Sequence, residues 1–209
     1  MVDDYLNDQE QWQRALAWLR ESGPAMLGAV IVVLLGYGGW RYWQNRQTNI
    51  ALAAEQRYEQ MLSALDGGNL ALGATLADRL IQEYPNTPYA TQADLMAARI
   101  AVQNDQLPDA AKRLRHVLDT TRDPEMKLMV RLRLARVLLG QNQPDEALKL
   151  IDGVQTGAFA SRYAEVRGDA LLAKGDREGA LQAYRSARAG ADTLDSQLLD
   201  LKIEDLARS

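Results

Sequence analysis

Residues 167–187 read RGDALLAKGDREGALQAYRSA, and this stretch decides the fold. Two helix-forming runs rich in alanine and leucine lie on either side of the breaker Lys174-Gly175-Asp176. Glycine after one helix and aspartate before the next are ordinary stop and start signals. Small, apolar, turn, small, aromatic and small residues follow in that order at Gly168, Leu171, Gly175, Ala180, Tyr184 and Ala187. The stretch therefore predicts two helices packed as a hairpin.

The same order of residue types recurs upstream, at a spacing close to the ~34 residues of the tetratricopeptide repeat (TPR). The looser units are Ala135, Leu138, Asn142, Ala147 and Ile151, then Ala98, Ala101, Asp105, Ala110 and Leu114, and lastly Gly73, Ala77 and Pro85. Small residues at 73, 110, 147 and 180 would let two helix backbones approach closely at each crossing. The pattern predicts a TPR-like α-solenoid, and the alternative is a helical bundle without repeats.

The whole of residues 44–209 has the pattern of an all-helical domain. Short breakers such as Asp66-Gly67-Gly68-Asn69 and Asp123-Pro124 divide it into segments about one helix long. No segment alternates apolar and polar residues with the β-branched enrichment of a strand. Residues 198–206 (LLDLKIEDL) combine an apolar stripe with acidic positions, which predicts a cap helix at the end of the array. The predicted fold class is all α.

Residues 22–43 are predicted to form a single transmembrane helix. From Ser22 to Trp40 the sequence has no charged side chain, and at ~1.5 Å per residue this stretch is about 29 Å long, close to one hydrocarbon thickness. A cleaved signal peptide is the alternative, but it would have a basic leader and a small-residue cleavage site, and this leader is acidic. Gly28 and Gly36 would let another membrane helix pack closely, although Val32 interrupts the motif, and the alternative is that both glycines only fill space in the bilayer.

The segments on either side of the span leave three questions open. In residues 1–21, Trp12, Leu16 and Leu19 have helical spacing, which fits an interfacial helix or simply an extended start of the span. The arginines before and after the span are nearly balanced, with a slight tilt toward a cytoplasmic C-terminal side. Residues 41–66 lack proline and glycine, so the span continues into the first repeat helix unless it breaks around residues 45–49.

Composition argues against chemistry and against nucleic acid. The net charge is −4 and no stripe of Lys and Arg interleaved with aromatics occurs, so no nucleic acid is expected. Cysteine is absent, and the single histidine, His116, has no second ligand or nucleophile at a suitable spacing. The glycines at 67, 68 and 73 do not form a phosphate loop. We expect no catalytic residue, no cofactor and no metal.

The repeat register predicts a groove for a partner on the inner face of the first helix of each repeat. Apolar and charged residues lie side by side there, as suits an extended or partly folded peptide. Packing against the next repeat would explain the same leucines without any partner. We expect Leu95→Asp together with Leu132→Asp to weaken capture of a partner without unfolding the domain. The predicted groove residues are Leu95, Arg99, Val102, Met129, Leu132, Arg136, Leu139, Glu165, Asp169 and Leu172.

The chain resembles the YfgM family, the ancillary subunit of the bacterial SecYEG translocon, over its whole length. The resemblance rests on residues 39–43 (GWRYW), 132–136 (LRLAR), 167–176 (RGDALLAKGD) and 201–203 (LKI). It implies an inner-membrane protein with residues 1–21 as a short cytoplasmic leader and a periplasmic TPR-like domain. It further implies work beside the translocon and the periplasmic chaperone PpiD, help to newly translocated polypeptides, and a link to Rcs envelope stress control. The family supplies no catalytic residues.

Two functional interpretations follow. The first is a translocon-associated subunit that tethers a chaperone and presents its groove to emerging, still unfolded chains. The second is a membrane-anchored regulator that sequesters a component of the Rcs-type stress response through its leader or its TPR face. An envelope hydrolase or isomerase is disfavoured because the sequence offers no nucleophile and base pair.

Overall fold

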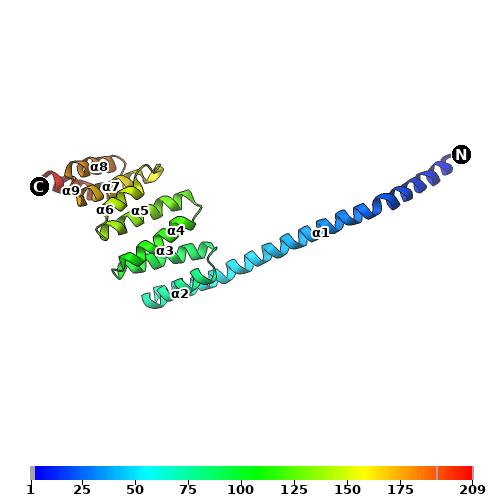
Figure 1. Cartoon of the computed structure of the whole chain (residues 1–209), viewed down its shortest axis with the longest axis horizontal. Helices are drawn as coiled ribbons and strands as arrows, with labels where there is room; N and C mark the ends of the chain where they lie inside the picture. Colours follow the sequence, from blue (N-terminus) through cyan, green and yellow to red (C-terminus); the bar gives the residue numbers. More distant parts are fainter. Residues whose placement is uncertain (1–2, 192, 209) are drawn as a thin grey trace. The chain divides into compact units, whose positions relative to one another are not determined.

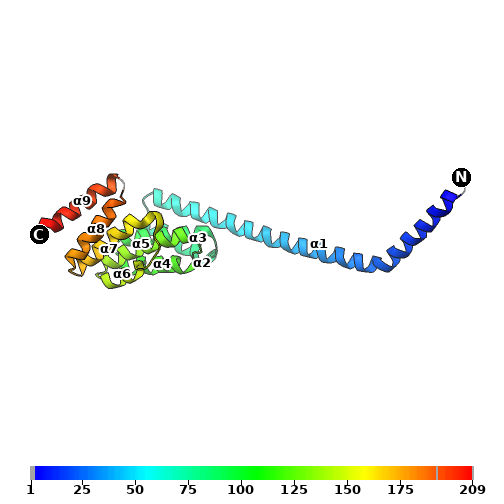
Figure 2. The same ribbon diagram turned by 90° about the horizontal axis from the view of Figure 1, so that it is seen from above.

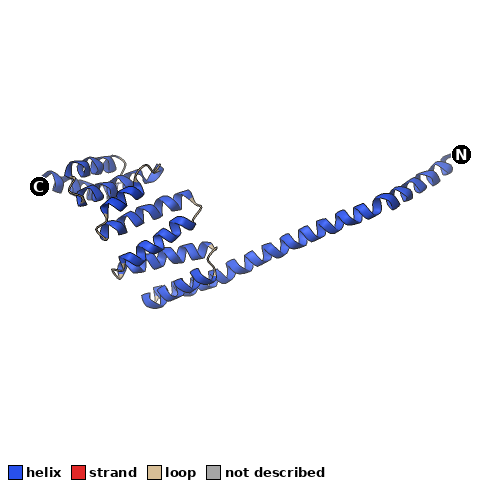
Figure 3. Ribbon diagram, in the orientation of Figure 1, coloured by secondary structure: helices blue, strands red, loops and turns tan. Residues whose placement is uncertain are grey.

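The computed structural model describes residues 3–191 and 193–208, and every regular element among them is a helix (Figures 1 and 3). Side chains are described for residues 12, 13, 16, 18, 28, 31–191 and 196–208. The all-α prediction is therefore confirmed for the described residues. The elements are α1 (Asp3–Asp66), α2 (Leu70–Glu83), α3 (Pro88–Gln103), α4 (Leu107–Thr120), α5 (Pro124–Gly140), α6 (Pro144–Ile151), the 3-10 turn η1 (Gly157–Phe159), α7 (Ala160–Ala173), α8 (Arg177–Ala189) and α9 (Thr193–Arg208).

The chain divides into two compact units, Met1–Leu52 and Ala53–Ser209. In the second unit, successive helices from α2 onward pack against one another as hairpins and form a solenoid (Figures 1 and 2). The end of α1 completes the first hairpin, because Met61 is buried in one cluster with Leu80 of α2 and Ala93 of α3. The predicted TPR-like solenoid is therefore confirmed, and the non-repetitive bundle is wrong.

Helix boundaries follow from local capping chemistry. Thr87 accepts a hydrogen bond from the backbone N–H of Ala90, and Pro88 opens α3 with a φ already suited to a helix. Asp123 and Pro124 start α5 in the same way. Asp176 caps α8 by accepting from the N–H of Gly179 at 2.9 Å. Gly175, at φ +85°, makes the turn before it, where a side chain would be strained.

The small residues predicted at the helix crossings lie where the packing requires them. Gly73 is buried, and Ala110, Ala147 and Ala180 are fully buried. At Gly168 an added Cβ would come within 2.4 Å of the ring of Tyr184. Each crossing therefore depends on the absence of side-chain volume, as the repeat pattern implies.

The described part of the N-terminal unit is the first part of α1, which is a continuous helix from Asp3 to Asp66. The alternative of a break around residues 45–49 is wrong, because the Thr48 hydroxyl donates to the Gln44 carbonyl at 3.0 Å inside an unbroken helix. Over the part of the chain that the structure describes, no helix is at once long enough and apolar enough to cross a bilayer. Of the leader residues singled out above, Trp12 and Leu16 are exposed, and the side chain of Leu19 lies outside those described.

The C-terminal segment forms helix α9, in the place predicted for the cap. Leu199 is 2% exposed and packs with Tyr184 and Ala187 of α8. Leu198 and Leu201 point away from that contact and are exposed. The helix thus covers the apolar end of the solenoid with one face and presents acidic and apolar residues on the other.

Candidate functional site

A groove of about 710 Å³ lies between α3, α4 and α5. Leu95, Arg99 and Val102 of α3 form one side of it, and Met129 and Arg136 of α5 form the other. These five residues come from the predicted set of ten. The repeat register therefore brings half of the predicted residues together, because α3 and α5 are the first helices of adjacent repeats.

Two of the predicted groove leucines are core residues. Leu132 is 4% exposed, does not line the groove, and belongs to the central hydrophobic cluster. Leu95 lines the groove but is only 8% exposed. The expectation that aspartate at both positions would spare the fold is therefore wrong, since both substitutions would bury a charge. Leu139 is half-buried and also packs against the central cluster instead of lining the groove.

The predicted residues of α7 take part in a polar network with the cap helix. Nζ of Lys202 lies 2.8 Å from Glu165 and 2.8 Å from Asp169. The Tyr184 hydroxyl donates to Asp169 at 2.7 Å, and Lys202 lies 5.3 Å from the centroid of the Tyr184 ring. Glu165 and Asp169 are thus occupied in binding α9. Leu172 is 38% exposed and lines neither of the cavities found.

This network shifts two pKa values. Burial, together with the hydrogen bond to Asp169, raises the pKa of the Tyr184 phenol well above its ordinary value of 10.0. Burial opposes the charge on Lys202, but the hydrogen bonds to Asp169 and Glu165 outweigh it and raise the pKa of the ammonium group. In the folded domain both groups are therefore kept in their protonated forms, and these forms make the contacts that join α7, α8 and α9.

The predicted set omits eight residues that line the groove: Gln92, Met96, Ala98 and Gln103 on α3, Leu114 on α4, and Met126, Arg133 and Val137 on α5. Met96, Met126 and Arg133 stand three or four residues from predicted members of the same helices, so helical periodicity could have found them. Arg136 lies 3.3 Å from Glu165, whereas in the described residues no carboxylate forms a salt bridge with Arg99 or Arg133. The groove therefore has an unneutralised cationic part.

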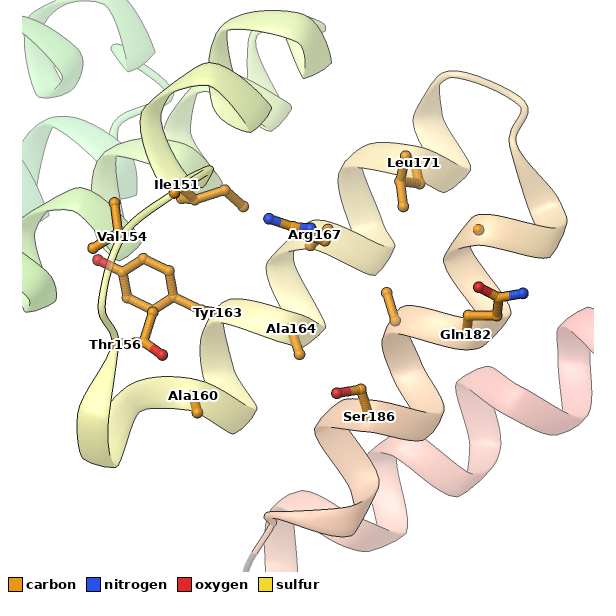
Figure 4. Close-up of a pocket in the computed structure, with 13 residues that line it drawn as sticks. Ile151, Val154, Thr156, Ala160, Tyr163, Ala164, Arg167, Leu171, Gln182 and Ser186 are labelled. Atoms are coloured by element: carbon orange, nitrogen blue, oxygen red, sulfur yellow. The ribbon is translucent and has the colours of Figure 1, made fainter.

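A second cavity of about 470 Å³ lies among α6, α7 and α8 (Figure 4). The short helix α6 ends at Ile151, and the loop that follows it, around Val154, forms one wall of the cavity. Small residues such as Ala160 and Ala164 line another wall. Its cation, Arg167, is bound to Asp152 at 2.5 Å. This cavity therefore lacks the free charge that marks the groove between α3 and α5.

His116 pairs with a buried carboxylate. Its Nδ1 lies 2.5 Å from Oδ2 of Asp94, a residue of α3 that is 4% exposed. Arg113 lies 3.6 Å from the same carboxylate and 2.8 Å from Asp78 of α2. The cluster ties α2, α3 and α4 together. Among the described residues, no group of three or more His, Cys, Asp or Glu side chains could hold a metal ion.

Comparison with known proteins assigns the family. A family model described as a tetratricopeptide repeat-like domain matches residues 16–208. The ancillary SecYEG translocon subunit of Escherichia coli (strain K12) is 32% identical over 99% of this chain and 100% of its own length. The chain belongs to this family. Other ancillary SecYEG translocon subunits are similar too: that of Aggregatibacter actinomycetemcomitans is 32% identical over 97% of this chain and 99% of its own length, and that of Haemophilus influenzae is 27% identical over 96% and 98%.

Solved structures show a similar fold for this member of the translocon subunit family. A MamA double mutant aligns with a TM-score of 0.57 at 17% identity, over 74% of this chain and 94% of that one. A MamA fragment from Desulfovibrio magneticus RS-1 aligns with a TM-score of 0.57 at 16% identity, over 74% and 95%. These similarities concern the helical solenoid alone.

Proposed function

We propose that this chain is a non-catalytic accessory subunit of the Sec translocon that binds polypeptides through its TPR-like domain. Its curated relatives carry the name ancillary SecYEG translocon subunit over nearly their full lengths. The observation that carries the binding role is the groove between α3 and α5, which combines apolar side chains with Arg99 and Arg133, two cations that have no salt-bridge partner among the described residues. A solenoid offers such a surface for protein recognition and needs no reacting group to use it.

In this proposal residues 22–43 anchor the chain in the inner membrane, residues 1–21 are cytoplasmic, and residues 44–209 lie in the periplasm. The side chains of residues 22–27, 29 and 30 lie outside those that the structure describes. The uncharged stretch from Ser22 to Trp40 supports the anchor, as does a run of five exposed apolar side chains from Ile31 to Leu35. Tyr37, Trp40 and Trp43 suit the depth of the lipid headgroups. Apart from the adjacent residues and the nearby backbone of α1 itself, no described atom lies within 4 Å of a Cβ placed on Gly28 or Gly36, which leaves both glycines accessible to a neighbouring membrane helix.

The proposed partners are the SecYEG translocon, a periplasmic chaperone such as PpiD, and newly translocated polypeptides, with lipid around the anchor. Family membership supports the translocon. The groove supports a polypeptide ligand, since it offers apolar surface for affinity and arginines for carboxylates.

Site-specific photo-crosslinking in cells tests this function. A photoreactive residue replaces Arg99, Val102 or Met129 in the full-length chain, and the control position is Arg115, which is exposed on α4 outside the groove. We expect translocon subunits, a periplasmic chaperone or secreted polypeptides to attach from the groove positions and not from Arg115. Cytoplasmic proteins as the main adducts, or equal adducts from Arg115, would refute the proposal.

A further inference from the structure

The groove between α3 and α5 is chemically polarised along its length. The two helices run in the same direction, because α4 lies between them in the chain and runs the opposite way (Figure 1). Met126 and Met129 lie in the first half of α5, and Met96 lies at the middle of α3. Arg99 and Arg133 follow about one turn later. On both helices the methionines therefore lie toward one end of the groove relative to the arginines, and Val102 lines the arginine end as well.

The arginine end selects for negative charge. Arg136 already contacts Glu165, but in the part of the chain that the structure describes Arg99 and Arg133 have no salt-bridge partner. A guanidinium group binds carboxylates in a planar, two-pronged geometry, and an incoming carboxylate would find both groups available. The net charge of −4 does not predict this preference, because the charges of the groove are local.

The methionine end selects for apolar side chains without fixing their shape. Three of the chain's six methionines line this groove. Their unbranched, polarisable side chains change rotamer readily and repack around ligands of different shape. Such a lining suits many sequences of one general character, whereas a single folded partner is better matched by rigid branched or aromatic residues.

We infer that the groove binds unfolded polypeptide segments in which aspartate or glutamate lies next to large apolar residues. This inference rests on the proposed function and specifies its ligand. The apolar side chains occupy the end lined by Met96, Met126 and Met129. The carboxylates pair with Arg99 and Arg133. The occupant is an unfolded client segment, and the order of residues within it matters little because the methionines and arginines of the groove lie only about one helical turn apart.

Peptide binding to the full-length chain in lipid nanodiscs tests the inference. Three short fluorescent peptides share the same leucines and differ only in carrying glutamate, glutamine or lysine between them. The glutamate peptide can form exposed charge pairs with Arg99 and Arg133, and the lysine peptide cannot. We therefore expect the glutamate peptide to bind about tenfold more tightly than the lysine peptide. Raising the salt concentration should narrow the difference. A scrambled glutamate peptide should bind within about threefold of the original, since an adaptable lining tolerates different orders.

Two variants test whether Arg99 and Arg133 cause the preference for the glutamate peptide. Arg99→Glu with Arg133→Glu should reverse the preference, so that the lysine peptide binds more tightly than the glutamate peptide. Arg115→Glu, an equal charge change on the exposed surface of α4, should leave the preference intact. Unchanged far-UV circular dichroism and melting temperature show that each variant is folded.

Equal affinity for the glutamate and lysine peptides, or loss of binding on scrambling, would overturn the inference. So would an unchanged preference in the double variant. Copurification of the wild-type chain with the translocon is measured separately. Its failure would refute the proposed function, whereas a failed peptide preference with copurification intact would refute this inference alone.

Discussion

At the residue scale, Tyr184 joins α7 to α8 with both its ring and its hydroxyl group. The ring packs over Gly168, where no Cβ intervenes, and the hydroxyl donates to Asp169 one position later in the same helix. The side chain is 1% exposed. Its position is therefore fixed by packing and hydrogen bonding together, and the ring cannot move aside cheaply.

We predict that Gly168→Ala destabilises the domain by about 1–3 kcal/mol, because the new Cβ would meet the Tyr184 ring at 2.4 Å. In a Tyr184→Leu background the same substitution should cost less or even stabilise, since alanine favours a helix over glycine by up to about 1 kcal/mol. Urea unfolding of the wild type and the three variants in this cycle measures the coupling between the two positions. If Gly168→Ala changed the free energy of unfolding equally in both backgrounds, contact with the Tyr184 ring would not be the cause of its cost.

At the element scale, α9 closes the solenoid by two kinds of contact. Leu199, Ile203 and Leu206 supply the apolar one with α8. Lys202 supplies the polar one by reaching Glu165 and Asp169 of α7. The cap therefore depends on a protonated lysine and on a neutral tyrosine beside it.

We predict that the domain loses stability as the pH rises above 10. The raised pKa of Tyr184 means that the unfolded chain gives up the phenol proton first, so unfolding releases a proton and becomes easier at higher pH. Lys202 acts in the same direction, because its contribution is complete below its ordinary pKa of 10.5 and is lost as the pH passes its raised folded value. One fully linked proton corresponds to about 1.4 kcal/mol per pH unit.

Denaturant unfolding from pH 8 to pH 12 checks this linkage, with Tyr184→Phe as the comparison. The variant should decline less steeply with pH than the wild type, because it lacks the phenol proton. If the free energy of unfolding fell equally steeply with pH in the two proteins, the Tyr184 phenol would not contribute to the loss of stability.

At the scale of the whole molecule, the three buried clusters formed by the described residues lie beyond residue 53. The first contains Met61 and Leu80, the central one Leu132 and Val166, and the last Tyr184 and Leu199. None of them includes a residue of the N-terminal unit. The stability of the repeat domain is therefore carried within residues 53–209.

We predict that residues 44–209 alone fold into a helical, cooperatively unfolding domain, and that they no longer copurify with membranes, because the proposed anchor is missing. Circular dichroism, urea unfolding and membrane fractionation measure the three properties. A disordered fragment would show that the N-terminal unit is needed for folding, and a fragment that stays with the membrane would argue against residues 22–43 as the anchor.

Local sequence signals are sufficient to predict the helical repeat and much of its register. Gly168, Tyr184 and the small residues at 110, 147 and 180 are local signals, because the close crossing of two helices admits few side chains at those positions. The breakers likewise mark the helix ends, since capping depends on neighbouring residues.

Tertiary structure alone decided which helical residues face a partner. Leu132 and Met129 lie on the same helix and look equally suited to a groove, yet Leu132 is buried in the core and Met129 lines the groove. Glu165 and Asp169 were predicted to meet a ligand, and instead they bind Lys202, more than thirty residues later in the chain. Periodicity places a residue on a helix face, but what covers that face depends on how neighbouring repeats and the cap pack against it.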